Sequence, residues 1–343
     1  MKTNLILWAA MLLLTATVNA QNQQIKSVRP TTKNPVNQIN HKIPEVATVI
    51  NIAAVGDIMM GTSYPTTKTL PTDSGKNSFK AVEKYLRGND ITFGNLEGTL
   101  LDNGQPAHYK THLKSTPYLF KSPVYYGRIL KETGFNLLSL ANNHASDFGD
   151  TGRISTAKAL DKYGIHYGGL EEHPTTEFVV RGVKYGFCAF SPSAHTIPIL
   201  DLRNAAKIIR DLKSRCDIVI VSFHGGAEGV QYEHTPRKGE SYFGEKRGNV
   251  YAFSHNAINA GADLVFGNGP HVTRAMELYK GRLIAYSLGN FCTYKSVSIA
   301  GACGIAPLLK VQVKKPASLL AGKSSQLSRI TIKVFKTIFQ TLP

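Results

Sequence analysis

The sequence predicts an α/β fold in which two sheets pack on each other and helices lie outside them. Three observations support this prediction. Unbroken apolar runs such as VINIAAVGD, DIVIVSFHGG and ADLVFGNGPH are typical of parallel strands buried on both faces. Apolar strands alternate with helical stretches early in the chain, which favours a parallel sheet. Hairpins come later in the chain, which indicates a second sheet packed on the first.

The predicted elements of the first half follow from these runs and from the glycines that end them. Gly164 ends a helix, and a long segment without apolar periodicity predicts a loop. In chain order the elements are a strand over about 50–55, a helix at 78–87, a strand at 91–94, a loop over 101–122, a helix at 124–133, a strand at 136–140 and a helix at 151–163.

In the second half of the chain, predicted strands again alternate with helices, and hairpins follow. Gly182 marks a turn between two short strands, Gly261 ends a helix, and Lys280-Gly281 predicts a tight hairpin turn. The elements are strands over about 177–181 and 184–190, a helix at 201–214, a strand at 217–223, a helix at 249–260, a strand at 263–267, the hairpin within 274–288, and strands at 305–314 and 328–336.

The first 47 residues differ in composition from the rest. Residues 1–20 are a predicted signal peptide, with a positive start, an apolar centre over 5–14 and the small-residue end Val18-Asn19-Ala20. The alternative, a membrane anchor, is disfavoured because the apolar stretch is shorter than the roughly 20 residues that a span needs. Residues 21–47 are rich in Gln, Asn, Lys and Pro and predict a flexible leader. The folded domain is expected over 48–340, in the periplasm or cell envelope after export.

Cysteine spacing and net charge limit the classes of function that the sequence supports. None of the four cysteines has a CxxC spacing, so a zinc ribbon is not expected. Cys188 and Cys216 lie in apolar contexts and predict buried thiols, whereas Cys292 and Cys303 flank a Ser/Gly-rich loop and could pair. The formal net charge of +17 favours attraction to anionic envelope polymers. Nucleic acid is not an expected partner, because export leads away from it and no nucleic-acid-binding motif is present.

Polar side chains follow five of the apolar strands. In sheets of this kind, ligands bind at the carboxyl ends of the strands, so we expect these side chains to converge. They are Asp57; Asn95 and Glu97; Asn142, Asn143 and His144; His224; and Asn268 and His271.

Each of these residues also has an ordinary structural interpretation. Asp57 alone would suit a turn or a helix cap, but a carboxylate is also a ligand for divalent cations. Asn95 and Glu97 are two residues apart, so on an extended backbone they point the same way, one to bind a metal and the other to orient it. The alternative is that this segment forms a surface loop.

The segment that contains Asn143 and His144 combines an amide oxygen, which can bind a metal, with an imidazole that can act as an acid. The alternative is an Asn-rich turn. Asp147 lies three residues after His144 and could hold its ring in one tautomer.

Two histidines end or follow strands. His224 precedes two glycines, which permit close backbone approach; a structural role and a ligand role are equally compatible with this context. His271 follows Gly269-Pro270, which forces an irregular loop that aims the side chain. Lys110 and Lys114, in the predicted long loop, are candidate substrate contacts.

The motifs GD (56–57), GNLEG (94–98), ANNHASDFG (141–149), SFHGG (222–226), GNGPHV (267–272) and YSLGNF (286–291) together resemble the poly-gamma-glutamate capsule synthesis family. These CapA-type proteins have the calcineurin-like metallophosphoesterase fold, and the match covers about 50–312. The resemblance implies a four-layer α/β/β/α sandwich of the metallo-dependent phosphatase type. It also implies one or two divalent ions, with metal ligands from Asp57, Asn95 or Glu97, Asn143, His224 and His271, and a role for His144 as the acid or phosphate-binding histidine. Asp147 completes the candidate catalytic pair through its position beside His144 in the sequence.

Three positions depart from the family pattern. Met59 stands where phosphoesterases of this fold usually have a His, Gly225 where family members usually have a Trp, and Asn268 where many have a His. The oxygen-rich ligand set favours Mn²⁺ or Mg²⁺ over Zn²⁺.

The sequence therefore supports two hypotheses. The first is an exported, metal-dependent phosphoesterase-like protein of capsule or envelope polymer synthesis, with a phosphoester or an anionic polymer as its substrate. The second is a non-catalytic polymer-binding or assembly accessory with the same fold. Membrane-associated synthesis machinery is a possible partner for either.

Overall fold

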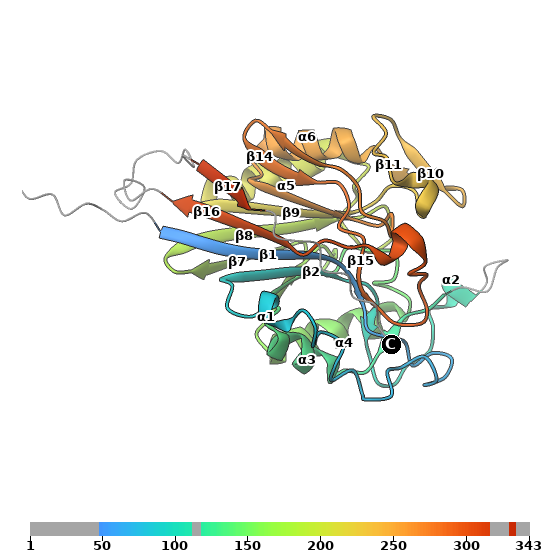
Figure 1. Ribbon diagram of the computed structural model, residues 1–343. Helices are drawn as coiled ribbons and strands as arrows, with labels where there is room; N and C mark the ends of the chain where they lie inside the picture. The colour runs from blue at the N-terminus through green and yellow to red at the C-terminus, as the bar shows by residue number, and fades with distance from the viewer. Residues whose placement is uncertain (1–47, 112–117, 316–328, 334–343) are drawn as a thin grey trace, which may run out of the picture. The chain divides into compact units, whose positions relative to one another are not determined.

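The structure is a computed structural model that describes residues 48–111, 118–315 and 329–333 (Figure 1). The predicted signal peptide and leader, together with Lys114, lie outside these residues. Within the described ranges, every helix is too short or too polar to cross a membrane. All described elements belong to one compact unit, which contains two large sheets.

The first large sheet holds the N-terminal strands. Its order is β17-β16-β1-β2-β5-β6, with β15 paired to β1 beside this path. β1, β2, β5 and β6 are parallel, and β16 and β17 add an antiparallel edge. The strands span Thr48–Met59 (β1), Ile91–Leu96 (β2), Leu137–Ser139 (β5), His166–Gly168 (β6), Asn290–Thr293 (β15), Leu309–Lys315 (β16) and Arg329–Lys333 (β17).

The second large sheet holds most of the later strands, in the order β13-β14-β12-β9-β8-β7. Its four central strands are parallel and both edge strands are antiparallel. The expected hairpin turn at Lys280-Gly281 joins β13 to β14. The strands span Thr175–Val180 (β7), Val183–Phe190 (β8), Ile218–His224 (β9), Leu264–Asn268 (β12), Met276–Tyr279 (β13) and Arg282–Ala285 (β14).

Alternation along the strands builds three apolar layers. In β1, Ile52 and Ala54 face the core between the sheets, whereas Ala53 and Val55 face the helices. Helices cover both outer faces (Figure 1). Those on the first sheet are α1 (Glu83–Leu86), α3 (Tyr126–Thr133) and α4 (Gly149–Lys162), and those on the second are α5 (Leu202–Arg215) and α6 (Val250–Ala260). The four-layer α/β/β/α architecture is confirmed.

Smaller elements lie at the carboxyl ends of the strands. They are β3 (Thr99–Leu100), β4 (Lys121–Ser122), α2 (His108–Thr111), the hairpin of β10 (Glu240–Tyr242) and β11 (Glu245–Gly248), and 3₁₀ turns at Val230–Tyr232 and Gly301–Gly304.

Several expectations are corrected. The predicted helix at 78–87 is α-helical only at Glu83–Leu86, because the preceding segment forms successive turns such as the bond from Val82 N to Phe79 O (3.0 Å). The predicted loop over 101–122 contains α2 and β4. Strands β3, β6, β10, β11 and β15 were not predicted, and β16 begins at Leu309 instead of residue 305. All four cysteines are free and buried, so Cys292 and Cys303 do not pair.

Candidate metal centre

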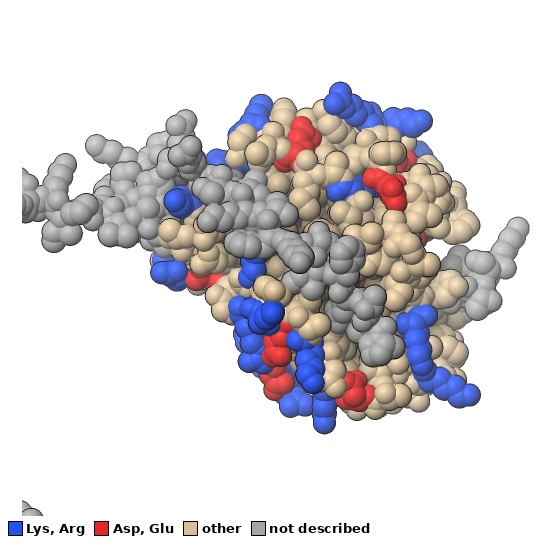
Figure 2. Space-filling model, viewed as in Figure 1, with Lys and Arg blue, Asp and Glu red and all other residues tan. Residues whose placement is uncertain are grey.

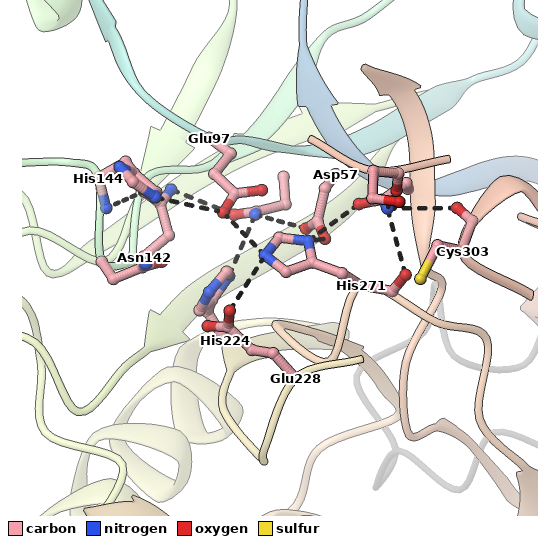
Figure 3. Close-up of polar contacts among 12 residues, drawn as sticks. Asp57, Glu97, Asn142, His144, His224, Glu228, His271 and Cys303 are labelled. Atoms are coloured by element: carbon pink, nitrogen blue, oxygen red, sulfur yellow. Dashed lines mark hydrogen bonds and ion pairs between the residues drawn. The ribbon is translucent and has the colours of Figure 1, made fainter. Parts of the chain in front are cut away.

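The candidate centre lies where the carboxyl ends of the two sheets meet (Figure 3). Asp57 near the end of β1 is in register with Asn95 of β2, and His224 at the end of β9 is in register with Asn268 of β12. Glu97 follows β2 directly, with its backbone N–H bonded to the Ile58 carbonyl (3.0 Å). The expected convergence of these strand ends is therefore present in the structure.

Asn95 connects the two sheets through hydrogen bonds. Its Nδ2 donates to Asp57 Oδ1 (2.8 Å) and lies 3.4 Å from His224 Nδ1. Its Oδ1 accepts from Asn142 Nδ2 (3.4 Å). Both polar atoms of the Asn95 side chain are thus engaged within the protein, so Glu97 is the better ligand of the pair.

Asp57, Glu97 and His271 form the tightest cluster: one ligand atom from each lies within 4.8 Å of the others. His271 Nδ1 is 3.2 Å from Asp57 Oδ2, and His271 Nε2 is 3.5 Å from Glu97 Oε1. The backbone of His271 has a φ of +56°, a conformation that costs a non-glycine residue about 1–3 kcal/mol. The fold thus tolerates strain to aim this imidazole between the two carboxylates.

Six buried atoms around this point have no hydrogen-bond partner among the described residues. Such atoms are rare in native structures and need an explanation. They are Asp57 Oδ2, Glu97 Oε1 and Oε2, Asn143 Oδ1, His224 Nε2 and Asn268 Oδ1. Carboxylate and amide oxygens with an imidazole nitrogen are a donor set that suits a divalent cation. The residues present therefore fit a metal.

The electrostatics of the cluster also favour a cation. Burial raises the pKa of Glu97 to about 8, with Asp57 and Glu228 adding to the increase and His271 opposing it. Burial would lower the pKa of His271, but the carboxylates of Glu97, Asp57 and Glu228 raise it to about 10. The negative charges therefore stabilise a positive charge at this position.

His224 is fully buried, and this desolvation holds its pKa well below the ordinary value. The positive charge of Arg247 and the neighbouring His271 and His144 act in the same direction. His224 thus keeps a neutral imidazole, which is the form that binds metals.

The two asparagines of the ANNH segment differ in what they contact. Asn142 Nδ2 donates to the Leu96 carbonyl (2.8 Å), and Asn142 Oδ1 accepts from the backbone N–H of His144 (3.1 Å). Asn143 Oδ1 is buried without a partner. Asn142 therefore fixes the loop, and Asn143 offers the free amide oxygen.

His144 and Asp147 form a hydrogen-bonded pair beside the cluster. His144 Nδ1 lies 2.8 Å from Asp147 Oδ2, the His144 ring stacks on Phe120 with centroids 4.0 Å apart, and Nε2 is 4.0 Å from Glu97 Oε1. Burial opposes ionisation of Asp147, but His144, Lys110 and the Phe120 N–H lower its pKa overall. A buried carboxylate thus orients an imidazole whose other nitrogen faces the cluster.

Lys110, a candidate substrate contact, supports this loop and lines the cavity beside it. Its Nζ donates to the Asn143 carbonyl (2.7 Å) and lies 3.0 Å from Asp147 Oδ1. Beside it opens a cavity of about 420 Å³ with room for part of a substrate. The lining includes Tyr109, Asn143, Ser193, Leu200 and Lys246.

Three residues near the cluster were not among the predicted site residues. Asn290 accepts from His271 Nδ1 (2.9 Å) through its Oδ1, and its motif YSLGNF was the available signal. Glu228 Oε2 lies 3.9 Å from His271 Nε2, and Arg247 Nη2 lies 2.9 Å from Glu228 Oε1. Arg247 belongs to the β10–β11 hairpin, which no sequence pattern indicated.

Two departures from the family pattern have structural explanations. Met59 is buried, and its sulfur accepts from the Gly61 N–H (3.3 Å), so this position supplies no hard ligand. At Gly225 an added Cβ would lie 2.9 Å from the Arg247 carbonyl oxygen. The β10–β11 hairpin therefore occupies the space that a large side chain at 225 would need.

The four-layer α/β/β/α sandwich, with a donor cluster where the strand ends meet, is a fold of the metallo-dependent phosphatase type. The family model of the bacterial capsule synthesis protein PGA_cap matches residues 51–295. The chain therefore belongs to this family, and the resemblance seen in the sequence is confirmed.

Two curated relatives agree with this assignment. The capsule biosynthesis protein CapA of Bacillus anthracis is 30% identical over 71% of this chain and 59% of its own length. The PGA biosynthesis protein CapA of Bacillus subtilis (strain 168) is 31% identical over 71% of this chain and 63% of its own length. The chain thus spans less than two thirds of each relative.

Solved structures align with the chain at a lower level of similarity. A putative 5'-nucleotidase from Staphylococcus aureus shares 14% identity at a TM-score of 0.46, over 84% of this chain and 53% of that one. Similarity of this degree says nothing about activity.

Proposed function

We propose that the protein is a metal-dependent phosphoester hydrolase that acts in the synthesis of poly-gamma-glutamate or another anionic cell-envelope polymer. The observation that supports this most is the group of six buried metal-binding atoms without a hydrogen-bond partner, beside the His144–Asp147 pair. Metal ligands and an oriented proton donor are the parts that phosphoester hydrolysis needs.

In this proposal Asp57, Glu97, Asn143, His224 and His271 hold one or two divalent ions, Mn²⁺ or Mg²⁺ in preference to Zn²⁺. When bound, the metal supplies Lewis-acid chemistry at the phosphoryl group. Asn95 keeps the Asp57 carboxylate in place through its 2.8 Å hydrogen bond.

His144 is assigned the proton transfer. Its Nδ1 is held by Asp147, so Nε2 is the nitrogen that gives a proton to the leaving oxygen or stabilises its charge. The stacked Phe120 ring and the Lys110 contacts to Asp147 and Asn143 prevent this imidazole from rotating away. Asp147 acts by orienting the ring, as carboxylates behind functional histidines do.

Location and partner are part of the same proposal. The signal-like segment ending at Ala20 supports export to the periplasm or cell envelope. The net charge of +17, and the excess of Lys and Arg over Asp and Glu on the face in Figure 2, support contact with an anionic polymer or membrane-associated synthesis machinery.

A second candidate function is a non-catalytic accessory that binds or assembles the polymer. Met59 and Asn268 favour it, because both replace imidazoles that phosphoesterases of this fold use. A relative in Mycobacterium tuberculosis (strain CDC 1551 / Oshkosh), 28% identical over 59% of this chain and 55% of its own length, is named a probable polyglutamine synthesis accessory protein.

An assay for hydrolysis of aryl phosphomonoesters and phosphodiesters by Mn²⁺-loaded protein distinguishes the hydrolase from the non-catalytic accessory. For the hydrolase, chelation abolishes turnover, and His144→Asn lowers it by about a hundred- to ten-thousandfold with the metal retained. The matched control is His255→Asn, because His255 lies on helix α6 outside the cluster and pairs with Glu277 of β13.

Equal turnover by wild type and His144→Asn would show that His144 has no such role. Salt-sensitive binding of poly-glutamate without any metal-dependent hydrolysis would support the accessory function instead.

A further inference from the structure

Two buried arginines flank the loop that follows His224, and they differ in how well they are paired. Arg274 forms a two-pronged ion pair with buried Glu240 (3.0 and 2.8 Å) and donates to the carbonyls of Tyr232 and Ala227. A guanidinium has five N–H donors, and this one is well supplied with acceptors. Arg274 is therefore a structural residue.

Arg247 is equally buried, with 2% of its side chain exposed, but it is poorly paired. Among the described residues, the one hydrogen bond of its guanidinium runs from Nε to the Gly226 carbonyl (3.1 Å). Nη2 lies 2.9 Å from Glu228 Oε1 without hydrogen-bond geometry, and Nη1 is 3.7 Å from the exposed Glu245. A buried cation with free donors is costly unless an anion completes it.

The position of Arg247 connects it to the candidate metal centre. Glu228 Oε1 faces Arg247, and Glu228 Oε2 lies 3.9 Å from His271 Nε2, as the dashed contact in Figure 3 shows. The Glu228 side chain is 18% exposed, whereas those of Asp57 and Glu97 are fully buried. Glu228 thus contacts both Arg247 and the cluster while keeping part of its side chain open to solvent.

The backbone fixes the guanidinium in this place. The Gly226 N–H donates to the Arg247 carbonyl (2.9 Å), while Arg247 Nε donates back to the Gly226 carbonyl. This reciprocal pair joins the hairpin to the loop after β9, so Arg247 cannot retreat from the cluster without breaking both bonds.

We propose that Arg247 is an oxyanion-binding residue of the candidate metal centre, which takes a phosphoryl oxygen of the substrate with its free Nη donors. Glu228 holds the guanidinium until the anion takes its place. The inference rests on the proposed function for the identity of the anion as a phosphate ester. A planar guanidinium suits a tetrahedral oxyanion because it can donate two parallel hydrogen bonds.

The probe is inorganic phosphate, titrated into Mn²⁺-loaded protein by calorimetry, with metal content and melting temperature measured for each variant. Arg247→Met is expected to weaken phosphate binding by about ten- to a hundredfold. Arg247→Lys is expected to recover only part of the lost phosphate affinity, because Lys keeps the positive charge but lacks the two parallel N–H donors of a guanidinium. Lys238→Met, a change of exposed charge near the same hairpin, leaves binding within about threefold of wild type.

Glu228→Gln is the second variant, and it tests the idea if Arg247→Met does not fold. Removing the competing negative charge while keeping the shape is expected to tighten phosphate binding by about tenfold. A merely structural role for the pair predicts no such gain.

Unchanged phosphate affinity in folded, metal-containing Arg247→Met overturns the inference, as does weaker binding in Glu228→Gln with its metal retained. Arg247-dependent phosphate binding without ester hydrolysis supports this inference and contradicts the hydrolase. Ester hydrolysis that is unchanged in Arg247→Met contradicts this inference and supports the hydrolase.

Discussion

The Asp147→Asn substitution tests how the fold holds the imidazole of His144. The Asp147 carboxylate accepts from the Phe120 N–H (2.8 Å) and from His144 Nδ1 (2.8 Å), and it lies 3.0 Å from Lys110 Nζ. The Asn side chain has the shape of Asp and keeps one acceptor oxygen. Its other terminal atom is an N–H₂ group, which cannot accept a hydrogen bond from the donor that it faces. At least one buried charge-assisted contact is therefore lost.

The magnitude follows from burial. Removing one partner of a buried ion pair costs about 3–5 kcal/mol, and a hydrogen bond to a charged group contributes about 1.5–3 kcal/mol. Lys110 retains 18% exposure, and an amide oxygen in the place of Oδ2 keeps the contacts to the Phe120 N–H and His144 Nδ1, so both moderate the loss. We expect the free energy of unfolding near neutral pH to fall by about 2–4 kcal/mol.

The pH dependence has a definite sign. Because the folded protein holds the pKa of Asp147 below the ordinary value of 3.8, the carboxylate stabilises the fold above that value. This contribution disappears as the pH falls through the lower, folded-state pKa. The difference between wild type and Asp147→Asn should therefore be full near neutral pH and shrink in acid.

Urea unfolding followed by circular dichroism, from neutral pH stepwise into acid, measures both quantities. Asp211→Asn is the matched control, because Asp211 pairs with Arg215 at an exposed position and its loss should scarcely change stability. If Asp147→Asn were no less stable than this control, or if its deficit grew in acid, the reasoning about the buried pair would be refuted.

Other predictions follow from the same structure. Turnover by Asp147→Asn should fall by about ten- to a hundredfold, less than for His144→Asn, as steady-state kinetics would show; an equal or larger loss contradicts a purely orienting role. Gly267→Ala places a Cβ 2.4 Å from the Tyr286 carbonyl oxygen and should destabilise the fold by about 1–3 kcal/mol in thermal unfolding, whereas a wild-type melting curve contradicts this. Binding of poly-glutamate, measured by calorimetry, should weaken as salt rises, because screening shortens to about 8 Å near physiological ionic strength, and salt-independent binding contradicts the electrostatic account. Mass spectrometry of exported protein should find Gln21 at the N-terminus, and retention of residues 1–20 in the membrane would indicate an anchor.

The long strands could be predicted because burial on both faces determines their composition. β1, β9 and β12 contain long apolar runs, and the polar residues at their ends could be recognised as converging. The short strands could not, since a segment such as β15 becomes a strand through its pairing with β1, far away in the sequence. The segment before α1 has helical apolar spacing but forms turns, because Phe79 and Val82 are buried in that conformation.

The candidate site also has a part that could be predicted from the sequence and a part that could not. Sequence position brought Asp57, Glu97 and His271 together, since each follows an apolar strand. The sequence could not predict that both polar atoms of the Asn95 side chain are hydrogen-bonded, or that Arg247 reaches Glu228. These contacts depend on how segments that are distant in the sequence pack together.

The metal content of purified protein tests the central claim most directly. After saturation with Mn²⁺ and removal of free ion, elemental analysis should find one or two equivalents in wild type and in His144→Asn. The double variant Asp57→Ala/His271→Ala should lose most of the metal while keeping its fold by circular dichroism. Wild-type protein without bound metal after saturation would contradict the account.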